Sequence, residues 1–437
     1  MAEEAGGLRR AIRLPHATAM VVGTIIGASI FVQPSEVTSQ VHSVGGVLLV
    51  WFLAGLLTLI GSLVCAELAS TFTRTGGVYV YLSEAFHPAL GFLWGWAMLL
   101  TMHSGIIAFI ATVFARYTGA FVALSPLAAK VVAIGVIILL SAVNYAGVRQ
   151  GARLQTLFTA GKMFAIVAIV GLGFALGGRV PEHFVGASGA ENTLRGFLLA
   201  MVAGLFSYGG WHMVTYSSEE TVEPAKTIPR ALLIGTLVVT VTYMAMTAVY
   251  LYVMPLDKVA SSTRVAADLA DTLLGSGGAG AISMIVLFSS FGALAGIVLA
   301  GPRVYYAMAQ DGLLFKWFAE LHPVYGTPHR AIVLQAIWAS LLVATGTFRA
   351  LFTRVVYTEW IFFALMAIGL MVLRKRPGVH RQYSIPLYPL APVIFVVSSL
   401  AIVTNTLVSN PRDSVIGLGL VLVGLPVYFL WVKRPRT

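Results

Sequence analysis

Long runs of apolar residues recur along almost the whole chain, separated by short polar segments. Each run is close to the roughly 20 residues that a helix needs to cross a bilayer. The runs are continuous, whereas a membrane-spanning strand would alternate polar and apolar positions. In lipid, only helices and closed barrels satisfy their backbone hydrogen bonds. The pattern therefore predicts an all-α membrane protein with twelve helical spans, at residues 15–41, 45–70, 87–118, 126–146, 154–178, 195–220, 228–254, 280–310, 330–347, 351–373, 388–409 and 414–432.

The composition agrees with this pattern. Hydrophobic residues make up 58% of the chain and charged residues 10%, whereas soluble proteins have roughly 45–50% and 25%. This excludes a soluble enzyme with one anchor, a disordered protein and a nucleic-acid binder. The net charge of +11 comes from Lys and Arg in short gaps between spans. About two-thirds of these fall on the side that holds both termini, which predicts cytoplasmic termini in a multi-pass plasma-membrane protein.

No segment has the length or composition of a separate soluble domain. The longest stretches between spans, near 179–194 and 255–279, are rich in Gly, Ser and Ala and are expected to be surface loops. The first apolar run lacks the small-residue cleavage site of a signal peptide. We therefore expect one transmembrane domain over residues 1–437, with spans one to five at 15–178, six to ten at 195–373, and eleven and twelve at 388–432.

Two spans contain glycines at mid-membrane depth, each group followed by an aromatic residue. Span one has Gly23 and Gly27, and span six has Gly204, Gly209 and Gly210. Glycine costs a helix interior about 1 kcal/mol relative to alanine, and close helix packing would explain a single pair. Interrupted spans at matching positions in two halves instead indicate a transporter binding site. We therefore expect spans one and six to be broken within an inverted repeat of five plus five spans.

A broken helix leaves backbone groups without helical partners. The N-terminal end of a half-helix can bind a carboxylate, and the carbonyls at a C-terminal end can bind an ammonium group. An α-amino acid carries both groups, so the expected ligand is an amino acid.

Five sequence motifs resemble the amino acid–polyamine–organocation superfamily, particularly the L-type amino-acid transporters and their bacterial relatives. They are GTIIGASIFVQP at 23–34, CAELASTFTRTGGVYVYL at 65–82, FTAGKMFAI at 158–166, LFSYGGWHMVTYSSEET at 205–221 and RVYYAMAQDGLL at 303–314. The resemblance implies the inverted-repeat fold, with two further C-terminal helices and with substrate between spans one and six. It also implies sodium-independent transport of amino acids, often by exchange.

The resemblance also implies a set of site residues. The substrate carboxylate would meet the amides of Gly27, Ala28 and Ser29, and the ammonium group would meet the carbonyls of Ile25, Phe206 and Gly209, with Phe206 as an aromatic gate. Relatives often have Gly-Ser-Gly in place of Gly27-Ala28-Ser29, and Asn in place of His212. Because of these departures, the substrate preference of the relatives is not carried over to this chain. His212 is a candidate substrate contact or a histidine facing a polar cavity, and Tyr243 is a candidate contact or a packed aromatic.

Lys162 is the one basic residue assigned to the interior of a predicted span rather than to one of its two ends. A buried charge in a span is functional by default. The resemblance implies that its ammonium group replaces the cation of sodium-coupled relatives and bridges spans one and eight, where Ser289 and Ser290 are candidate contacts. We expect no metal ion and no cofactor. Proton coupling through Lys162 is the second possibility, because burial can lower the pKa of a lysine.

Charges near the predicted cytoplasmic ends admit two interpretations. Glu219, Glu220 and Glu223 precede Lys226 and Arg230 and form either a gate network or solvated surface pairs of little energetic weight. Asp311 follows Arg303, which is typical of helix-end electrostatics.

The sequence bears on three classes of function: an enzyme, a receptor or scaffold, and a transporter. The chain has no HExxH, GxSxG or GxxxxGK[ST] motif, so catalysis is not expected. A non-transporting receptor or scaffold would be expected to carry a long cytoplasmic sensor domain. Exchange of neutral L-amino acids is the leading hypothesis, with a proton-coupled amino-acid or amine symporter as the alternative. Eukaryotic relatives attach a partner glycoprotein through an extracellular cysteine; the one cysteine here, Cys65, lies in a span, so no disulfide-linked partner is expected.

Overall fold

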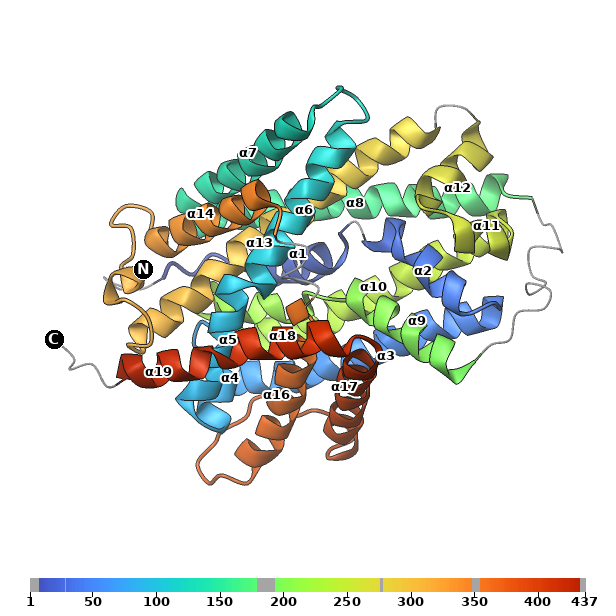
Figure 1. Cartoon of the computed structure of the whole chain (residues 1–437). Helices are drawn as coiled ribbons and strands as arrows, with labels where there is room; N and C mark the ends of the chain where they lie inside the picture. The colour runs from blue at the N-terminus through green and yellow to red at the C-terminus, as the bar shows by residue number, and fades with distance from the viewer. Residues whose placement is uncertain (1–7, 28, 179–192, 276–277, 348–353, 433–437) are drawn as a thin grey trace.

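The structure is a computed structural model of the chain that describes residues 8–27, 29–178, 193–275, 278–347 and 354–432 (Figure 1). These residues form helices and no strand. The isolated β-bridge in the described part joins Ile12 to Thr221. The chain enters α1 from the end of the bundle at which α19 stops (Figure 1), and we call this end the terminal face.

The helices have the following bounds in chain order, with η marking 3₁₀ helices. They are α1 (Leu14–Ile25), η1 (Ser29–Phe31), α2 (Gln33–Gln40), α3 (Val44–Thr71), α4 (Val78–Ala85), α5 (Pro88–Leu100), α6 (Met102–Thr118), α7 (Pro126–Tyr145), α8 (Val148–Leu176), α9 (Leu194–Ser207), η3 (Trp211–Glu220), α10 (Pro224–Val253), α11 (Leu256–Ser261), α12 (Val265–Leu274), α13 (Gly278–Gln310), η4 (Lys316–Ala319), α14 (His329–Thr345), α16 (Thr358–Arg374), α17 (Leu390–Ser409), α18 (Pro411–Leu422) and α19 (Gly424–Val432).

The described helices match the twelve predicted spans. In the described part of the chain, nine helical stretches are long and apolar enough to cross a membrane, and α1 and α14 are shorter apolar helices. The remaining predicted span corresponds to α16, which has 17 residues. The fold-class prediction is therefore confirmed: the protein is an all-α, multi-pass membrane protein.

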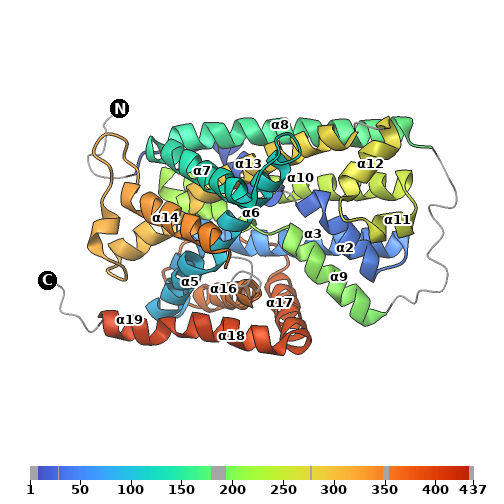
Figure 2. The ribbon, with the colours of Figure 1, turned by 45° about the horizontal axis from the view of Figure 1, so that its top comes forward.

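Helices at equivalent positions of the two predicted halves pack against each other. α3 contacts α10, α6 contacts α13, and α7 contacts α14. The broken spans also meet, because α1 contacts η3. α16, α17, α18 and α19 gather on one side of this bundle (Figure 2).

The expectation of a surface loop over 255–279 is wrong for its described part. α11 and α12 form there, and Val259, Val265 and Leu269 are buried. α12 packs on α13 and α10, and α11 packs on α2. Apolar residues at helical spacing bury one face of α12, which the Gly, Ser and Ala content of the segment concealed. The other expected loop falls mainly on residues 179–192, which lie outside the described residues.

Candidate substrate site

The first broken span stops being an α-helix in the middle of the bundle. α1 ends at Ile25, and the backbone of Ile26 is extended, with φ −76° and ψ 91°. η1 begins at Ser29 and α2 follows. The chain therefore exposes the last carbonyls of α1 at this point, as the sequence analysis predicted. The amide of Gly27 donates to the Ile25 carbonyl at 2.9 Å. Ala28, a predicted carboxylate contact, lies outside the described residues.

The second broken span is interrupted at Tyr208–Gly210, between α9 and η3. Gly210 has φ +100°, a conformation that favours glycine. A Cβ atom on Gly210 would lie 3.2 Å from the carbonyl oxygen of Thr24. The hydroxyl of Thr24 lies 3.2 Å from the Gly210 carbonyl oxygen. Glycine at this position thus allows the two breaks to approach each other closely.

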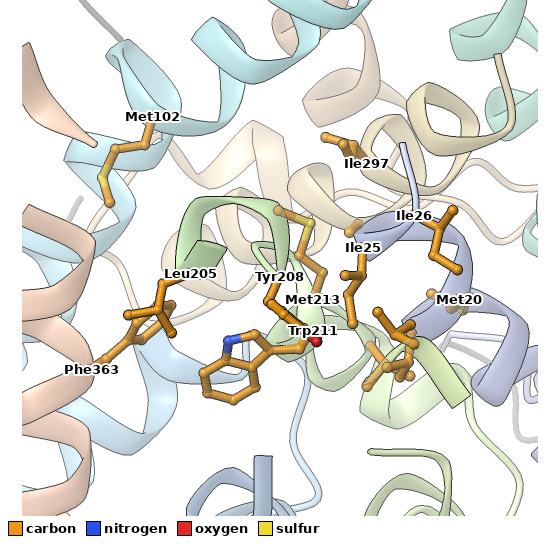
Figure 3. Packing of buried hydrophobic residues seen from close by; sticks show 14 of the residues in the cluster. Met20, Ile25, Ile26, Met102, Leu205, Tyr208, Trp211, Met213, Ile297 and Phe363 are labelled. Carbon is orange, nitrogen blue, oxygen red and sulfur yellow. The ribbon is translucent and has the colours of Figure 1, made fainter. Parts of the chain in front are cut away.

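Tyr243 of α10 joins the two breaks. Its hydroxyl oxygen lies 3.1 Å from the carbonyl oxygen of Ile25 and 3.0 Å from that of Ser207. The Ser29 hydroxyl lies 3.4 Å away. The ring is fully buried against Trp51 and Tyr208. Figure 3 shows Ile25, Tyr208 and Trp211, from the two breaks, lying close together.

Lys162 of α8 is fully buried beside the first break. Its ammonium nitrogen donates to the carbonyls of Gly23 at 3.0 Å and Ile26 at 2.5 Å. It also donates to the backbone carbonyl of Ser289 in α13, at 3.4 Å. The Ser289 hydroxyl donates to the Gly27 carbonyl at 3.1 Å. Lys162 and Ser289 therefore tie the end of α1 to α13, while the buried Ser290 hydroxyl has no hydrogen-bond partner in the described part.

A cavity of about 1120 Å³ opens at the two breaks. Gly27 and Ser29 line it from the first break, and Phe206, Gly209 and Gly210 from the second. Phe206 is 36% exposed, and its role as a gate stays a prediction. The lining continues to residues at the end of the bundle away from the terminal face, namely Arg116, Tyr117, Arg264, Gly346 and Asp413. The cavity therefore leads from the breaks toward that opposite end.

Toward the terminal face, ion pairs lie between the breaks and the helix ends. Arg303 and Glu220 are both fully buried and form two hydrogen bonds of 2.8 Å. The amides of Ala11 and Ile12 donate to the backbone carbonyl of Glu220. From the sequence, Glu220 was expected to lie near Lys226 and Arg230, whereas in the structure it pairs with Arg303.

Two further ion pairs lie at the same face. Arg74 pairs with Asp311 at 2.8 Å, and the Tyr79 hydroxyl donates to Asp311 at 2.6 Å. Arg374 donates to both oxygens of the fully buried Glu67. Asp311 is therefore bound by Arg74, which the helix-end interpretation did not foresee because the two residues are 237 positions apart in the sequence.

His212 was a candidate substrate contact, but it does not line the cavity at the two breaks. It is buried among aromatic rings, with centroids 4.9 Å from Phe363, 5.3 Å from Trp211 and 5.7 Å from Trp94. Its neighbours Trp211 and Met213 line the cavity, and His212 does not. Neither of its ring nitrogens has a hydrogen-bond partner among the described residues.

Glu359 is a cavity residue that was not foreseen from the sequence. It lies within predicted span 351–373 and lines the cavity from the first turn of α16. An ionisable residue inside a predicted span was the available signal, as it was for Lys162. Among the described residues, no group of three or more His, Cys, Asp or Glu side chains is placed to hold a metal ion.

Comparison with known proteins identifies the family. The sequence profile described as "Amino acid permease" matches residues 12–429, nearly the whole chain. The chain belongs to the amino acid permease family. As a member of this family it is a membrane transporter of amino acids and not an enzyme.

Several characterised amino acid permeases are similar along their length. The serine/threonine exchanger SteT of Bacillus subtilis is 32% identical, with both chains covered completely. The b(0,+)-type amino acid transporter 1 of Mus musculus is 32% identical over 97% of this chain and 88% of its own. The large neutral amino acids transporter small subunit 2 of Homo sapiens is 32% identical over 98% of this chain and 82% of its own.

Proposed function

We propose that this amino acid permease exchanges neutral L-amino acids across the plasma membrane without sodium, by alternating access. The observation that carries the proposal is the pair of broken helices, which meet at Tyr243 and open into one cavity. The chain is similar over its full length to a protein named as an exchanger of serine and threonine, two neutral amino acids.

The breaks suit a zwitterion because they offer both backbone carbonyls, which accept hydrogen bonds, and backbone amides, which donate them. The carbonyls of Ile25, Phe206 and Gly209 would accept hydrogen bonds from the α-ammonium group, in place of the Gly27 and Gly209 amides that donate to Ile25 and Phe206 in this structure. The amides of Gly27, Ala28 and Ser29, with that of Gly27 released from the Ile25 carbonyl, would bind the α-carboxylate at the start of the second half of span one. Tyr243 would position the Ile25 carbonyl, and Phe206 would close over the bound substrate.

Lys162 supports sodium independence. A lysine ammonium group has three donors, and three backbone carbonyls from α1 and α13 surround this one. A cation bound there would meet the same oxygens. We infer that the fixed ammonium group performs the structural task of a coupling ion, with Ser289 as its link to α13.

Alternating access requires a second state that opens at the terminal face. The ion pairs Arg303–Glu220, Arg74–Asp311 and Arg374–Glu67 lie there. We propose that the structure faces outward, that these pairs close its cytoplasmic side, and that they separate as the cavity closes at the other end. The bias of Lys and Arg supports cytoplasmic termini. Cys65, buried in α3, supports the absence of a disulfide-linked partner.

The proposal is tested with purified protein in liposomes. Vesicles preloaded with unlabelled serine should take up labelled alanine or serine, whereas empty vesicles should take up much less. Replacing external sodium by potassium should leave the rate unchanged. Failure to take up any proteinogenic amino acid would contradict transport. Accumulation in empty vesicles driven by an imposed pH gradient would instead identify a proton-coupled symporter.

A further inference from the structure

A carboxyl group in the cavity wall has no partner in the described structure. Glu359 lines the cavity, and its side chain makes no hydrogen bond or ion pair with any described residue. Aromatic residues of the same helix, Trp360 and Phe363, line the cavity beside it. The Glu359 side chain is partly exposed to the cavity, and ionisable residues within a membrane mark sites of function by default.

The position of Glu359 on its helix explains why it faces the cavity. Glu359 and Phe363 are four residues apart, so they lie on one face of α16. Both line the cavity, as does Val356 just before the helix. Glu359 is also in the first turn of α16, where the helix dipole favours a negative charge. The fold thus supports a carboxylate at this position without supplying a donor for it.

Glu359 lies on the side of the cavity that a substrate side chain would reach. Phe363, one turn along the same helix, packs on Trp211 at the second break, with ring centroids 5.1 Å apart. Leu205 and Phe363 are neighbours in Figure 3, and both line the cavity. A substrate whose backbone groups occupy the breaks would therefore extend its side chain along Trp211 and Phe363, toward α16.

We propose that Glu359 is a specificity-determining residue that accepts a hydrogen bond from a donor on the substrate's side chain. The inference rests on the proposed function and narrows its preferred substrates to neutral amino acids with a side-chain hydroxyl or amide. An apolar pocket discriminates weakly between a hydroxyl and a methyl group, whereas a site with a buried polar group rejects the analogue that leaves this group unpaired.

Threonine and valine test this inference, because they have the same shape and differ by one hydroxyl group. We expect threonine to compete with labelled alanine ~10- to 100-fold more strongly than valine in the unmodified protein, the range expected for a hydrogen bond to a charged group. Glu359→Leu should reduce the ratio to less than ~3-fold, and Glu359→Gln, which keeps an acceptor, should give an intermediate ratio. Glu320→Leu, at a more exposed glutamate paired with Arg330, is the control and should keep the original ratio.

A binding measurement separates this inference from the proposed function. Threonine should raise the thermal unfolding midpoint of the purified protein more than valine does, and Glu359→Leu should remove the difference. If that holds but no exchange occurs, the proposed function fails and the inference stands. If lysine competes more strongly than threonine, the preference for a side-chain hydrogen-bond donor stands, and the restriction to neutral substrates fails.

Two outcomes would overturn the inference. One is an unchanged threonine-to-valine ratio in Glu359→Leu, with alanine exchange intact. The other is loss of pH-driven alanine accumulation in that variant without a change in the ratio, which would make Glu359 a proton carrier.

Discussion

The ammonium nitrogen of Lys162 lies 2.5 Å from the carbonyl oxygen of Ile26, at the residue where α1 stops being helical. The same nitrogen reaches Gly23 one turn earlier and Ser289 on α13. One side chain of α8 therefore satisfies carbonyls that the first break leaves without helical partners, and it links them to a third helix.

Lys162→Ala should impair turnover. The variant leaves buried carbonyls without a donor, and a hydrogen bond to a charged group is worth about 1.5–3 kcal/mol. We expect the exchange rate in liposomes to fall by at least ~10-fold, since about 1.4 kcal/mol corresponds to a factor of ten. Lys130→Ala is the control, because Lys130 donates to the Ala344 carbonyl at an exposed position. A normal exchange rate in Lys162→Ala would remove the proposed role of the ammonium group.

Tyr243→Phe should weaken substrate binding while leaving the fold intact. The ring keeps its packing on Trp51 and Tyr208, but the hydroxyl between Ile25 and Ser207 is lost. We expect the half-saturating alanine concentration for exchange to rise by roughly 5- to 10-fold, since a neutral hydrogen bond is worth about 1 kcal/mol. Tyr250→Phe removes a hydroxyl from the same helix that bonds to Ile30 instead. Equal effects of the two variants would argue against a special role for Tyr243.

Arg303 and Glu220 should be energetically coupled. Removing one partner leaves the other charge buried and unpaired, which typically costs about 3–5 kcal/mol. We expect Glu220→Gln and Arg303→Met each to lower the thermal unfolding midpoint of the purified protein. The double variant, which removes both charges, should be more stable than the sum of the two losses implies. Strictly additive losses would show that the pair is not coupled.

Gly210→Ala should disrupt the contact between the breaks. Alanine at φ +100° is strained, and its Cβ would lie 3.2 Å from the Thr24 carbonyl oxygen. A strained backbone of this kind costs about 1–3 kcal/mol, so exchange should fall by ~10-fold or more. Gly171→Ala is the control, because no atom lies within 4 Å of a Cβ built there in α8. Wild-type exchange by Gly210→Ala would mean that the two breaks need not approach each other.

Both breaks could be predicted from the sequence because their signals are local. Gly23 and Gly27 in one apolar run, and Gly209 and Gly210 in another, weaken a helix wherever that helix packs. The same reasoning fails for side chains around the breaks. Trp211 and Met213 line the cavity and His212 does not. The packing of η3 against α1, α3 and α13 decides which of its side chains point into the cavity.

The sequence by itself contains the lengths of the apolar runs, the glycines at the two breaks and Lys162 inside a span. These patterns determined the all-α membrane fold and the two interrupted helices. The lipid environment leaves the backbone few alternatives, so these local patterns suffice. The partners of charged and polar groups were decided only by the tertiary structure. Arg74 meets Asp311, Arg303 meets Glu220, and Glu359 meets the cavity. Such contacts join helices that are distant in the sequence, and their geometry depends on the packing of the whole bundle.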